Sequence, residues 1–233
     1  MVTRHTYVRR RLDRPVAAGN QGFMQMTSKR IRVQGLSTDA GKVRLGGIIN
    51  PLPRSVADGE LIKPEMVSKV LELLRTRFSY IVLDLPHDFR ETSLAGLDLA
   101  DDVVTLLAPD LASVRAANGA IEVFTLLGYA RDKVTLALNW IFERRGLARK
   151  DIENVLRQPI KMVVPFSPEV FVSAINLGNP PVLSGPTSAI GTLFEDFAFS
   201  LSRSEDITQK PSNPTDTWKR VSERENSRPP VKR

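Results

Sequence analysis

Two apolar patterns alternate along the middle of the chain: short apolar runs, and longer stretches with an apolar residue every three or four positions. The runs, such as "YIVLDL" and "VTLALN", are typical of buried strands, and the longer stretches are typical of helices. Asp110 and Ser167 are predicted helix caps, and glycine ends two of the helices. We predict strands over 43–49, 79–84, 102–109, 133–139 and 160–165, and helices over 64–78, 91–100, 110–127, 150–157, 168–178 and 186–201.

Single helices alternate with single strands over short connections through most of this region. Such an order produces βαβ units, whose strands lie parallel in one sheet. We therefore predict the α/β fold class, with a Rossmann-like, mostly parallel sheet and helices on both faces. Ligands of such sheets bind outside the carboxyl ends of the strands, so the residues at those ends are the candidate site residues.

Polar residues and turns stand where the predicted strands end. Asp84 closes the strand in "YIVLDLP", where a carboxylate can hold a water, a metal ion or a phosphate-bound magnesium ion, or can simply cap the next segment. Asn139 closes another strand, and its amide can both donate and accept hydrogen bonds at the edge of a purine base. The last predicted strand is followed by a turn made of Pro165, Phe166 and Ser167.

The region from about residue 43 to residue 202 resembles a known family in several motifs at once. The motifs are "YIVLDLP", "LDLADDVVTLLAPDLASVRAANGAIEVFTLLGY", "KVTLALNW" and "PIKMVVPFSPEVFVSAINLGNPPVL". Together they are similar to the MinD/ParA group of P-loop ATPases, and most similar to its CpaE-like branch, which is associated with type IV (Tad) pilus assembly and its polar placement. The resemblance implies a Rossmann-like sheet, ATP and magnesium as cofactors, and nucleotide-driven dimerisation.

The resemblance also implies a role for individual residues. Asp84 matches the Walker B or switch II acid, which holds the magnesium shell through water. Asn139 matches the residue that reads the adenine base. The turn that lies beside that base is matched by Pro165, Phe166 and Ser167. The Asn-x-Gly-x-Pro turn of the family is matched at Asn176 and Gly178, which we expect to be structural.

The phosphate-binding part of the family pattern is missing. The deviant Walker A motif, K-G-G-x-G-K-[ST], offers backbone N–H groups and a lysine to the phosphates and a hydroxyl to magnesium. The only candidate, "LSTDAGKV" at 36–43, contains Gly41 and Lys42 but has Val43 in place of the hydroxyl residue, and a predicted strand follows it. The Walker A lysine is thus absent, and we predict no catalytic residue. The strand that carries the water-orienting Asp of the family is absent too.

The missing P-loop strand would lie in the middle of the family's sheet, beside the strand of Asp84. Without it, that strand would carry unpaired backbone N–H and C=O groups, which are costly to bury. Three outcomes are open. The first 34 residues supply a substitute strand, with "KRIRVQ" as the only fair candidate; the neighbouring strands pair directly; or the sequence is a truncated reading of a longer gene.

Composition narrows the kinds of site and the location. The chain has 233 residues, no cysteine and two histidines, which argues against disulfides, thiolate-bound metals and a multi-histidine metal site. It contains no apolar run long enough for a transmembrane helix, and its N-terminus lacks the apolar part of a secretory signal. We expect a cytoplasmic location, with a peripheral position at the inner membrane as the alternative.

The net charge of +7 comes from the two ends of the chain. Residues 1–34 carry eight Lys or Arg and one acid, and residues 203–233 carry eight Lys or Arg and five acids. We predict a basic N-terminal arm or linker over 1–34, a MinD/ParA/CpaE-like α/β domain over 35–202, and a disordered polar tail over 203–233. In that tail, Trp218 and Val221 could form a small docking spot.

Three functions follow from these observations. The first is a CpaE/MinD-like protein of pilus assembly or subcellular localisation that is degenerate and hydrolysis-incompetent. The second is an active Mg-ATPase whose P-loop is missing from this chain or supplied by a partner. The third is a DNA- or membrane-tethering protein that acts through the basic arm. The expected partners are a second copy or a related ATPase, pilus or secretion machinery proteins, and nucleic acid or an anionic membrane at residues 1–34.

Overall fold

The structure of the chain is a computed structural model. It describes the backbone of strands β1 (Arg4–Val8), β2 (Arg32–Asp39) and β3 (Lys42–Ile48). It describes backbone and side chains over 63–76, 78, 80–143, 145–202, 207, 209–210 and 214–227. The chain forms two compact units, which are taken in turn below.

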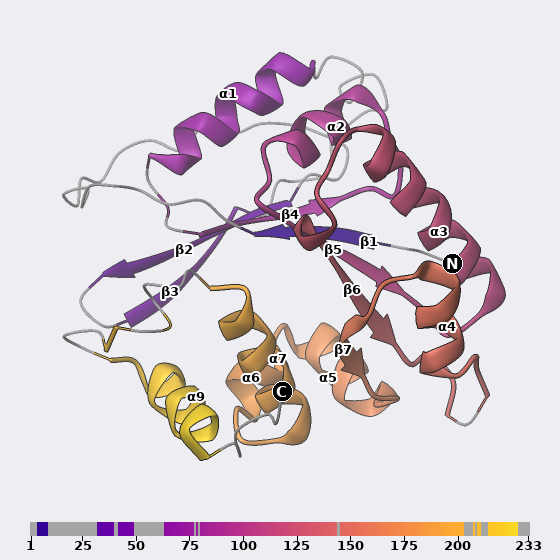
Figure 1. Ribbon diagram of the computed structural model, residues 1–233. Helices are drawn as coiled ribbons and strands as arrows, with labels where there is room; N and C mark the ends of the chain where they lie inside the picture. The colour runs from indigo at the N-terminus through magenta and orange to yellow at the C-terminus, as the bar shows by residue number, and fades with distance from the viewer. Residues whose placement is uncertain are drawn as a thin grey trace. The chain divides into compact units, whose positions relative to one another are not determined.

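The first unit consists of a sheet and the helices that flank it (Figure 1). Besides β1 and most of β2 and β3 it holds α1 (Pro64–Arg75), β4 (Tyr80–Leu85), α2 (Glu91–Asp98), β5 (Asp102–Leu107), α3 (Leu111–Leu126), the 3-10 helix η2 (Arg131–Lys133), β6 (Val134–Asn139), α4 (Arg149–Leu156) and most of β7 (Ile160–Val164). The strands and helices predicted for this region are confirmed, with ends that differ by a few residues.

The strands follow the order β3-β2-β4-β1-β5-β6-β7 across the sheet. β5 and β6 are parallel, and β1 is antiparallel to both β4 and β5, so β4, β5 and β6 all run in one direction. Helices connect these three strands, as βαβ units require. The predicted α/β fold class is therefore confirmed, with the difference that β1 and β2 run against their neighbour β4.

The strand β1 resolves the question of the missing central strand. In its register Thr6 lies opposite Asp84 on one side and opposite Val104 on the other. The first 34 residues thus supply a substitute strand, which was the first of the three expected outcomes. The segment that does so is Arg4–Val8, however, whereas "KRIRVQ" overlaps β2, which pairs with the other side of β4. The expected basic arm therefore contributes backbone to the sheet.

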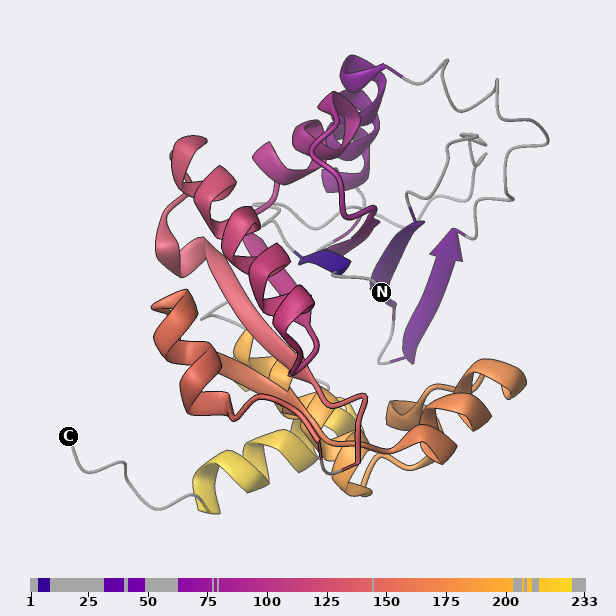
Figure 2. The ribbon, with the colours of Figure 1, turned by 90° about the vertical axis from the view of Figure 1, so that its right-hand side faces the viewer.

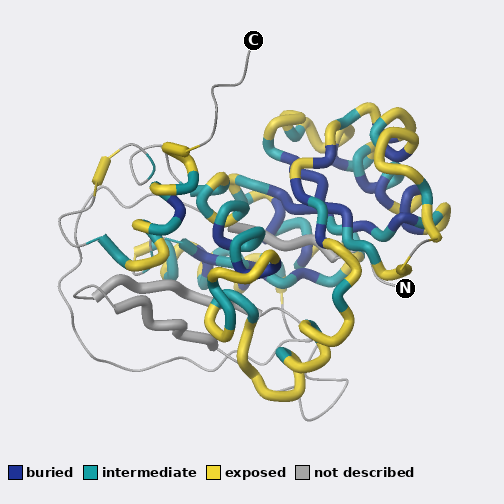
Figure 3. Tube along the Cα trace, turned by 90° about the horizontal axis from the view of Figure 1, so that it is seen from below, coloured by how far each residue is buried: buried dark blue, intermediate teal, exposed yellow. Residues whose placement is uncertain are grey.

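The core of this unit lies between the sheet and its helices, and Figure 3 shows it as the dark blue part of the trace. Figure 2 shows α3 running lengthwise beside the sheet, and its Phe124 is 2% exposed. The Phe124 ring stacks on Tyr129 with 5.7 Å between the centroids and meets the edge of Phe89 at 5.8 Å. The core strands are built mainly of Val103, Val104, Leu107, Val134, Leu136 and Leu138.

Strand β4 differs from the expectation of a strand buried on both faces. Its burial alternates: Ile81, Leu83 and Leu85 are buried, and the residues between them are only partly covered. The buried face packs with Val67 and Leu71 of α1 and with Leu97 of α2. Asp84 belongs to the other, partly exposed face, where a carboxylate keeps contact with water.

The second unit consists mainly of helices: α5 (Pro168–Leu177), α6 (Pro181–Ser184), α7 (Ala189–Ser200) and α9 (Asp216–Ser227). Helix α7 is capped by Ser188, whose hydroxyl accepts a hydrogen bond from the Gly191 N–H at 3.1 Å. The expectation of disorder for 203–233 is wrong for α9, which is helical and buries Val221. The sequence does not predict this helix, because α9 carries almost no apolar periodicity and its ionic partners are acidic residues of α7.

A compact polar contact fixes the connection between α4 and β7. The carboxylate of Glu153 accepts hydrogen bonds from the Ile160 N–H at 2.8 Å and from the Arg149 Nε at 2.9 Å. Arg149 also donates to the carbonyl of Ile160 at 2.6 Å. Between them, Arg157 ends α4 in the left-handed region with φ 51°. The N–H of Ile160, followed by Arg149, lowers the pKa of the Glu153 carboxyl.

We expect a proline in β1 to disrupt the sheet. Thr6→Pro removes an N–H donor from a strand with neighbours on both sides, and should lower the free energy of unfolding by about 3 kcal/mol. The measurement is urea denaturation, and the control is Thr6→Val, which keeps the N–H and suits a strand. An unchanged urea midpoint for Thr6→Pro would contradict the central position of β1.

Two glycines should respond to alanine with opposite signs. A Cβ at Gly191 would lie 2.9 Å from the Cα of Pro186 and still closer to the carbonyl oxygen of Gly185, whereas no described atom lies within 4 Å of one at Gly119. We expect Gly191→Ala to lower the free energy of unfolding by about 1–3 kcal/mol, because the backbone must shift. Gly119→Ala on α3 should raise it by about 0.5–1 kcal/mol. Thermal melts of both variants test this, and a stabilising Gly191→Ala would refute the close contact.

The Glu153 contact should make part of the stability depend on acid pH. Because the folded pKa lies below the usual value of 4.5, the contribution is present above pH 4.5 and is lost as the pH falls towards the folded pKa. Glu153→Gln cannot ionise, so the melting temperatures of wild type and variant should differ at pH 7 and converge below pH 4.5. A difference that stays constant with pH would exclude this role.

Candidate functional site

The candidate site lies along the carboxyl edge of the parallel strands. Because β4, β5 and β6 run in the same direction, Asp84, the Pro109-Asp110 turn and Asn139 lie at one edge of the sheet. Asp84 and Asn139 are three strand spacings apart in the order β4-β1-β5-β6, on the order of 14 Å. Only an extended ligand, such as a nucleotide, could reach both residues.

The strand β1 changes what this edge offers. Since β1 is antiparallel, it is its beginning, not its end, that lies at the carboxyl edge, with His5 opposite Leu85 and Arg4 opposite Leu106. A parallel strand in this place would lead at this edge into a loop and then a helix. The backbone between β4 and β5 therefore carries no strand-to-helix turn at the position where a phosphate loop would begin.

Asp110 adds a feature that the sequence did not reveal. Its Oδ1 caps α3 by accepting a hydrogen bond from the Ser113 N–H at 2.9 Å, as predicted. Its Oδ2 is buried and has no hydrogen-bond partner among the described residues. The neighbouring carbonyl of Pro109 accepts from the Leu147 N–H at 2.8 Å, which ties the following loop to this edge. Asp110 thus offers one unused acceptor atom, which suits a water or another hydrogen-bond donor.

The loop after β4 is organised by local contacts. Asp88 accepts a hydrogen bond from the buried Ser93 hydroxyl at 2.7 Å, and its other carboxylate oxygen lies 3.5 Å from the Arg90 Nε. His87 is exposed. These contacts hold the start of α2, and none of them involves Asp84.

The predicted turn after β7 lies in the second unit, together with residues 140–143. The Trp140 N–H donates to the carbonyl of Val164 at 2.9 Å, which joins the two segments. Pro165 and Phe166 are exposed, with 38% of Phe166 accessible, and Phe142 is exposed to 39%. These aromatic rings could stack on a flat base.

Ser167 differs from its predicted role. It occupies the N-cap position of α5, but its side chain makes no capping hydrogen bond. Its φ of −148° and ψ of 61° are not those of a usual N-cap, which explains why the hydroxyl does not reach the helix N–H groups. Gly178 ends α5 in the left-handed region with φ 63°, where glycine is favoured, in keeping with the structural role expected for it.

Comparison with known proteins places the chain in a family context. No protein-family model matches it. The septum site-determining protein MinD of Thermotoga maritima is 27% identical over 153 residues, which cover 63% of this chain and 56% of that protein. An uncharacterized ATP-binding protein of Methanocaldococcus jannaschii is 26% identical over 157 residues, which cover 67% of this chain and 58% of that protein.

Two solved structures share the fold. A ParA family ATPase from Chlorobium tepidum superimposes with a TM-score of 0.59 at 20% identity, covering 65% of this chain and 62% of that one. The septum site-determining protein MinD of Pyrococcus horikoshii, solved as a complex with Mg-ADP, superimposes with a TM-score of 0.55 at 16% identity, covering 70% and 66%. The chain is thus similar in sequence to MinD and shares the fold of MinD/ParA-type P-loop ATPases.

The relationship to MinD and ParA confirms the family resemblance seen in the sequence, while the CpaE-like branch stays a prediction. The chain spans a little over half the length of the two curated relatives named above, 56% and 58%. The roles inferred for Asp84, Asn139, Pro165, Phe166 and Ser167 stay predictions as well.

The described residues of the only Walker A candidate belong to strands and not to a phosphate loop. Residues 36–39 belong to β2, and Lys42 opens β3, which lies next to β2 in the sheet. A phosphate cradle needs a glycine-rich loop that leads into the N-terminus of a helix. Here a strand follows Lys42, so the lysine and the N–H groups beside it are not presented at a helix start.

The residues of this edge fit a magnesium nucleotide only in part. Asp84 is a partly exposed carboxylate of the kind that holds a magnesium ion through water, and Asp110 has an acceptor to spare. No group of three or more His, Cys, Asp or Glu residues that could hold a metal ion occurs in the described part of the chain. Since no described loop provides the phosphate contacts, these residues do not complete a Mg-ATP site.

Proposed function

We propose that this chain is a CpaE/MinD-like protein of pilus assembly or subcellular localisation that uses the MinD/ParA fold without hydrolysing ATP. The observation that carries the proposal is β1, which runs antiparallel between β4 and β5. ATP hydrolysis in P-loop proteins depends almost entirely on positioning the phosphates, magnesium and the attacking water. With β1 in this place and β3 after Lys42, no described element positions the phosphates.

Under this proposal the fold is kept for its surfaces. The partner is a second copy of the chain or a related ATPase, and pilus or secretion machinery proteins are the further partners. The chain acts in the cytoplasm or at the periphery of the inner membrane. None of the described helices is both long and apolar enough to cross a membrane.

The second candidate is an active Mg-ATPase whose P-loop is missing from this chain or supplied by a partner. The observation that favours it is the set of polar groups at the sheet edge, namely Asp84, Asn139 and the buried Oδ2 of Asp110, which has no partner in the part of the chain that the structure describes. A fold that serves only as a surface has no need of an uncompensated carboxylate oxygen. The tethering function of the basic segment 1–34 is a weaker third candidate, because β1 belongs to the sheet.

Calorimetric titration with Mg-ATP separates the first two candidates. The proposal predicts that the purified chain binds Mg-ATP no more tightly than a Kd of about 1 mM, that Asp84→Asn changes nothing, and that no phosphate is released. Adenosine and ATP should bind alike if only the adenine-side residues interact, and Asn139→Ala should then weaken both. Analytical ultracentrifugation should give the same mass with and without Mg-ATP.

The opposite result would be binding in the low micromolar range that requires magnesium and is weakened by Asp84→Asn. Such binding would contradict the proposal that the chain lacks a working Mg-ATP site, and would favour the second candidate, an active Mg-ATPase. An Asp88→Asn variant is the matched control, because Asp88 lies four residues away and is engaged with Ser93.

A further inference from the structure

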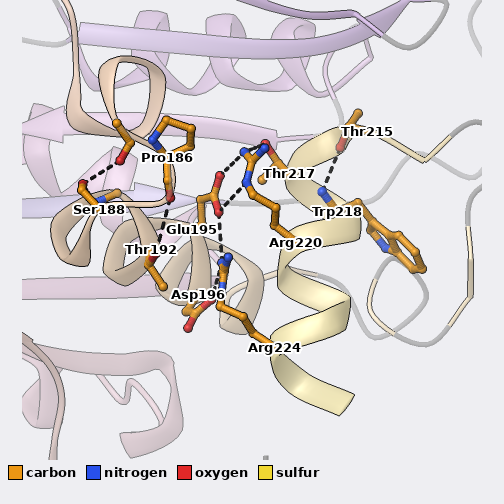
Figure 4. A network of polar contacts seen from close by, with 12 residues as sticks. Pro186, Ser188, Thr192, Glu195, Asp196, Thr215, Thr217, Trp218, Arg220 and Arg224 are labelled. Carbon is orange, nitrogen blue, oxygen red and sulfur yellow. Dashed lines mark hydrogen bonds and ion pairs between the residues drawn. The ribbon is translucent and has the colours of Figure 1, made fainter. Parts of the chain in front are cut away.

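The buried carboxylate of Glu195 is the most constrained ionic group in the second unit. Glu195 lies on α7, and its side chain is only 3% exposed. Transferring a carboxylate from water into a protein is costly unless cations and hydrogen-bond donors surround it. The partners of Glu195 come from α9, a helix more than twenty residues further along the chain (Figure 4).

Two arginines of α9 saturate this carboxylate. Arg220 donates to Oε1 through Nη2 and to Oε2 through Nε at 3.4 Å, and Arg224 donates to Oε2 at 3.0 Å. Arg224 also donates twice to the Asp196 Oδ1, at 2.8 and 2.6 Å. Planar guanidinium groups are well suited to such forked contacts. Hydrogen bonds to Glu195 raise the pKa of Arg220, so that its charge is retained.

Besides the two arginines, α9 brings one buried apolar residue to its attachment among the residues described. Val221 is its one buried residue among those described, and it lies between the two arginines on the same face of the helix. Lys219 and Asp216 form an ion pair on the exposed side at 3.1 Å. At the N-terminus, the Thr215 hydroxyl accepts from the Trp218 N–H at 3.1 Å. An isolated helix of 12 residues is marginal in water, so α9 depends on α7 for its folding.

We propose that α9 is a detachable latch, a helix that folds as it docks on α7 and is held there by the bridging of Glu195 and Asp196 with Arg220 and Arg224. The guanidinium groups remain accessible to ions, since the side chains of Arg220 and Arg224 are 27% and 25% exposed. Loss of the carboxylate charge releases and unfolds the latch, and leaves the first unit intact. The release uncovers an acidic face on α7 and frees two arginines at the same time.

Hydrogen exchange of the full chain, followed by mass spectrometry, tests the latch. In Glu195→Gln, the amides of residues 216–227 should exchange at least about tenfold faster, while those of β6 keep their wild-type rates. Lys219→Gln is the control, because it breaks only the exposed ion pair on the same helix and should leave both rates unchanged. In the double variant Glu195→Gln with Arg220→Gln, the acceleration of exchange in α9 should not exceed the product of the two single-variant accelerations. If the two side chains act as a pair, it should be smaller than that product.

Trp218 offers an independent reading of the same motion. The chain has two tryptophans, Trp140 and Trp218, so in a Trp140→Phe background the fluorescence anisotropy reports α9 alone. The anisotropy should fall with Glu195→Gln, and in the otherwise unmodified chain it should fall as sodium chloride is raised from low to high concentration.

Two results would overturn the latch. One is exchange in α9 and anisotropy of Trp218 that do not change with Glu195→Gln or with salt. The other is exchange that accelerates equally in α9 and β6, because α9 would then unfold only with the whole molecule. If Glu195→Gln does not fold, the salt series on the chain without this substitution decides between the latch and an integral helix.

Discussion

The backbone pairing of β1 with β4 and β5 is the interaction on which the sheet depends. Strands β4 and β5 run in the same direction, and β1 lies between them. Without β1, each would have an open row of N–H and C=O groups in the middle of the sheet. Five residues near the start of the chain close both rows at once. Their antiparallel direction satisfies the hydrogen bonds equally well, and it decides at the same time which end of the strand reaches the site edge.

The consequence for the site is a separation of its two halves. At the end where adenine is predicted to bind, Asn139 closes β6, a strand with five buried residues, and its position depends only on the regular part of the fold. Where a phosphate loop would be expected, the strand beside β4 is β1, and the lysine of the only glycine-lysine pair opens β3, which lies two strands from β4 on its other side. Asp84 of β4 and Asp110, which follows β5, also lie at this edge, and β1 separates the two strands. Under the proposed function, the chain keeps the fold of a nucleotide-binding protein, and β1 takes the place beside β4 with sheet hydrogen bonds.

The regular centre of the fold could be predicted from the sequence because its information is local. Apolar runs predict β4 to β7 and place Asp84 and Asn139 at strand ends. Capping residues such as Asp110 predict where helices begin. β1 could not be predicted, since "RHTYV" is short, lies among arginines and acquires its place from partners far along the chain. Helix α9 could not be predicted for a related reason. Its docking face consists of Arg220, Val221 and Arg224, and the ionic partners of this face, Glu195 and Asp196 of α7, lie far away in the sequence. The burial of the Asp110 Oδ2 without a partner among the described residues depends on the tertiary structure, so the sequence alone does not predict it.

The central place of β1 also governs the order in which the molecule can fold. Thr6 must meet Val104, so β1 cannot take its place in the sheet until α1, β4, α2 and β5 have been synthesised. Contacts between such distant segments close large loops and slow folding, whereas β5, α3 and β6 lie close together in sequence and can form early. Until β1 arrives, β4 and β5 expose open edges that other chains could occupy. The nascent protein therefore passes through a state in which β1, or a strand from another molecule, can occupy the same position between β4 and β5.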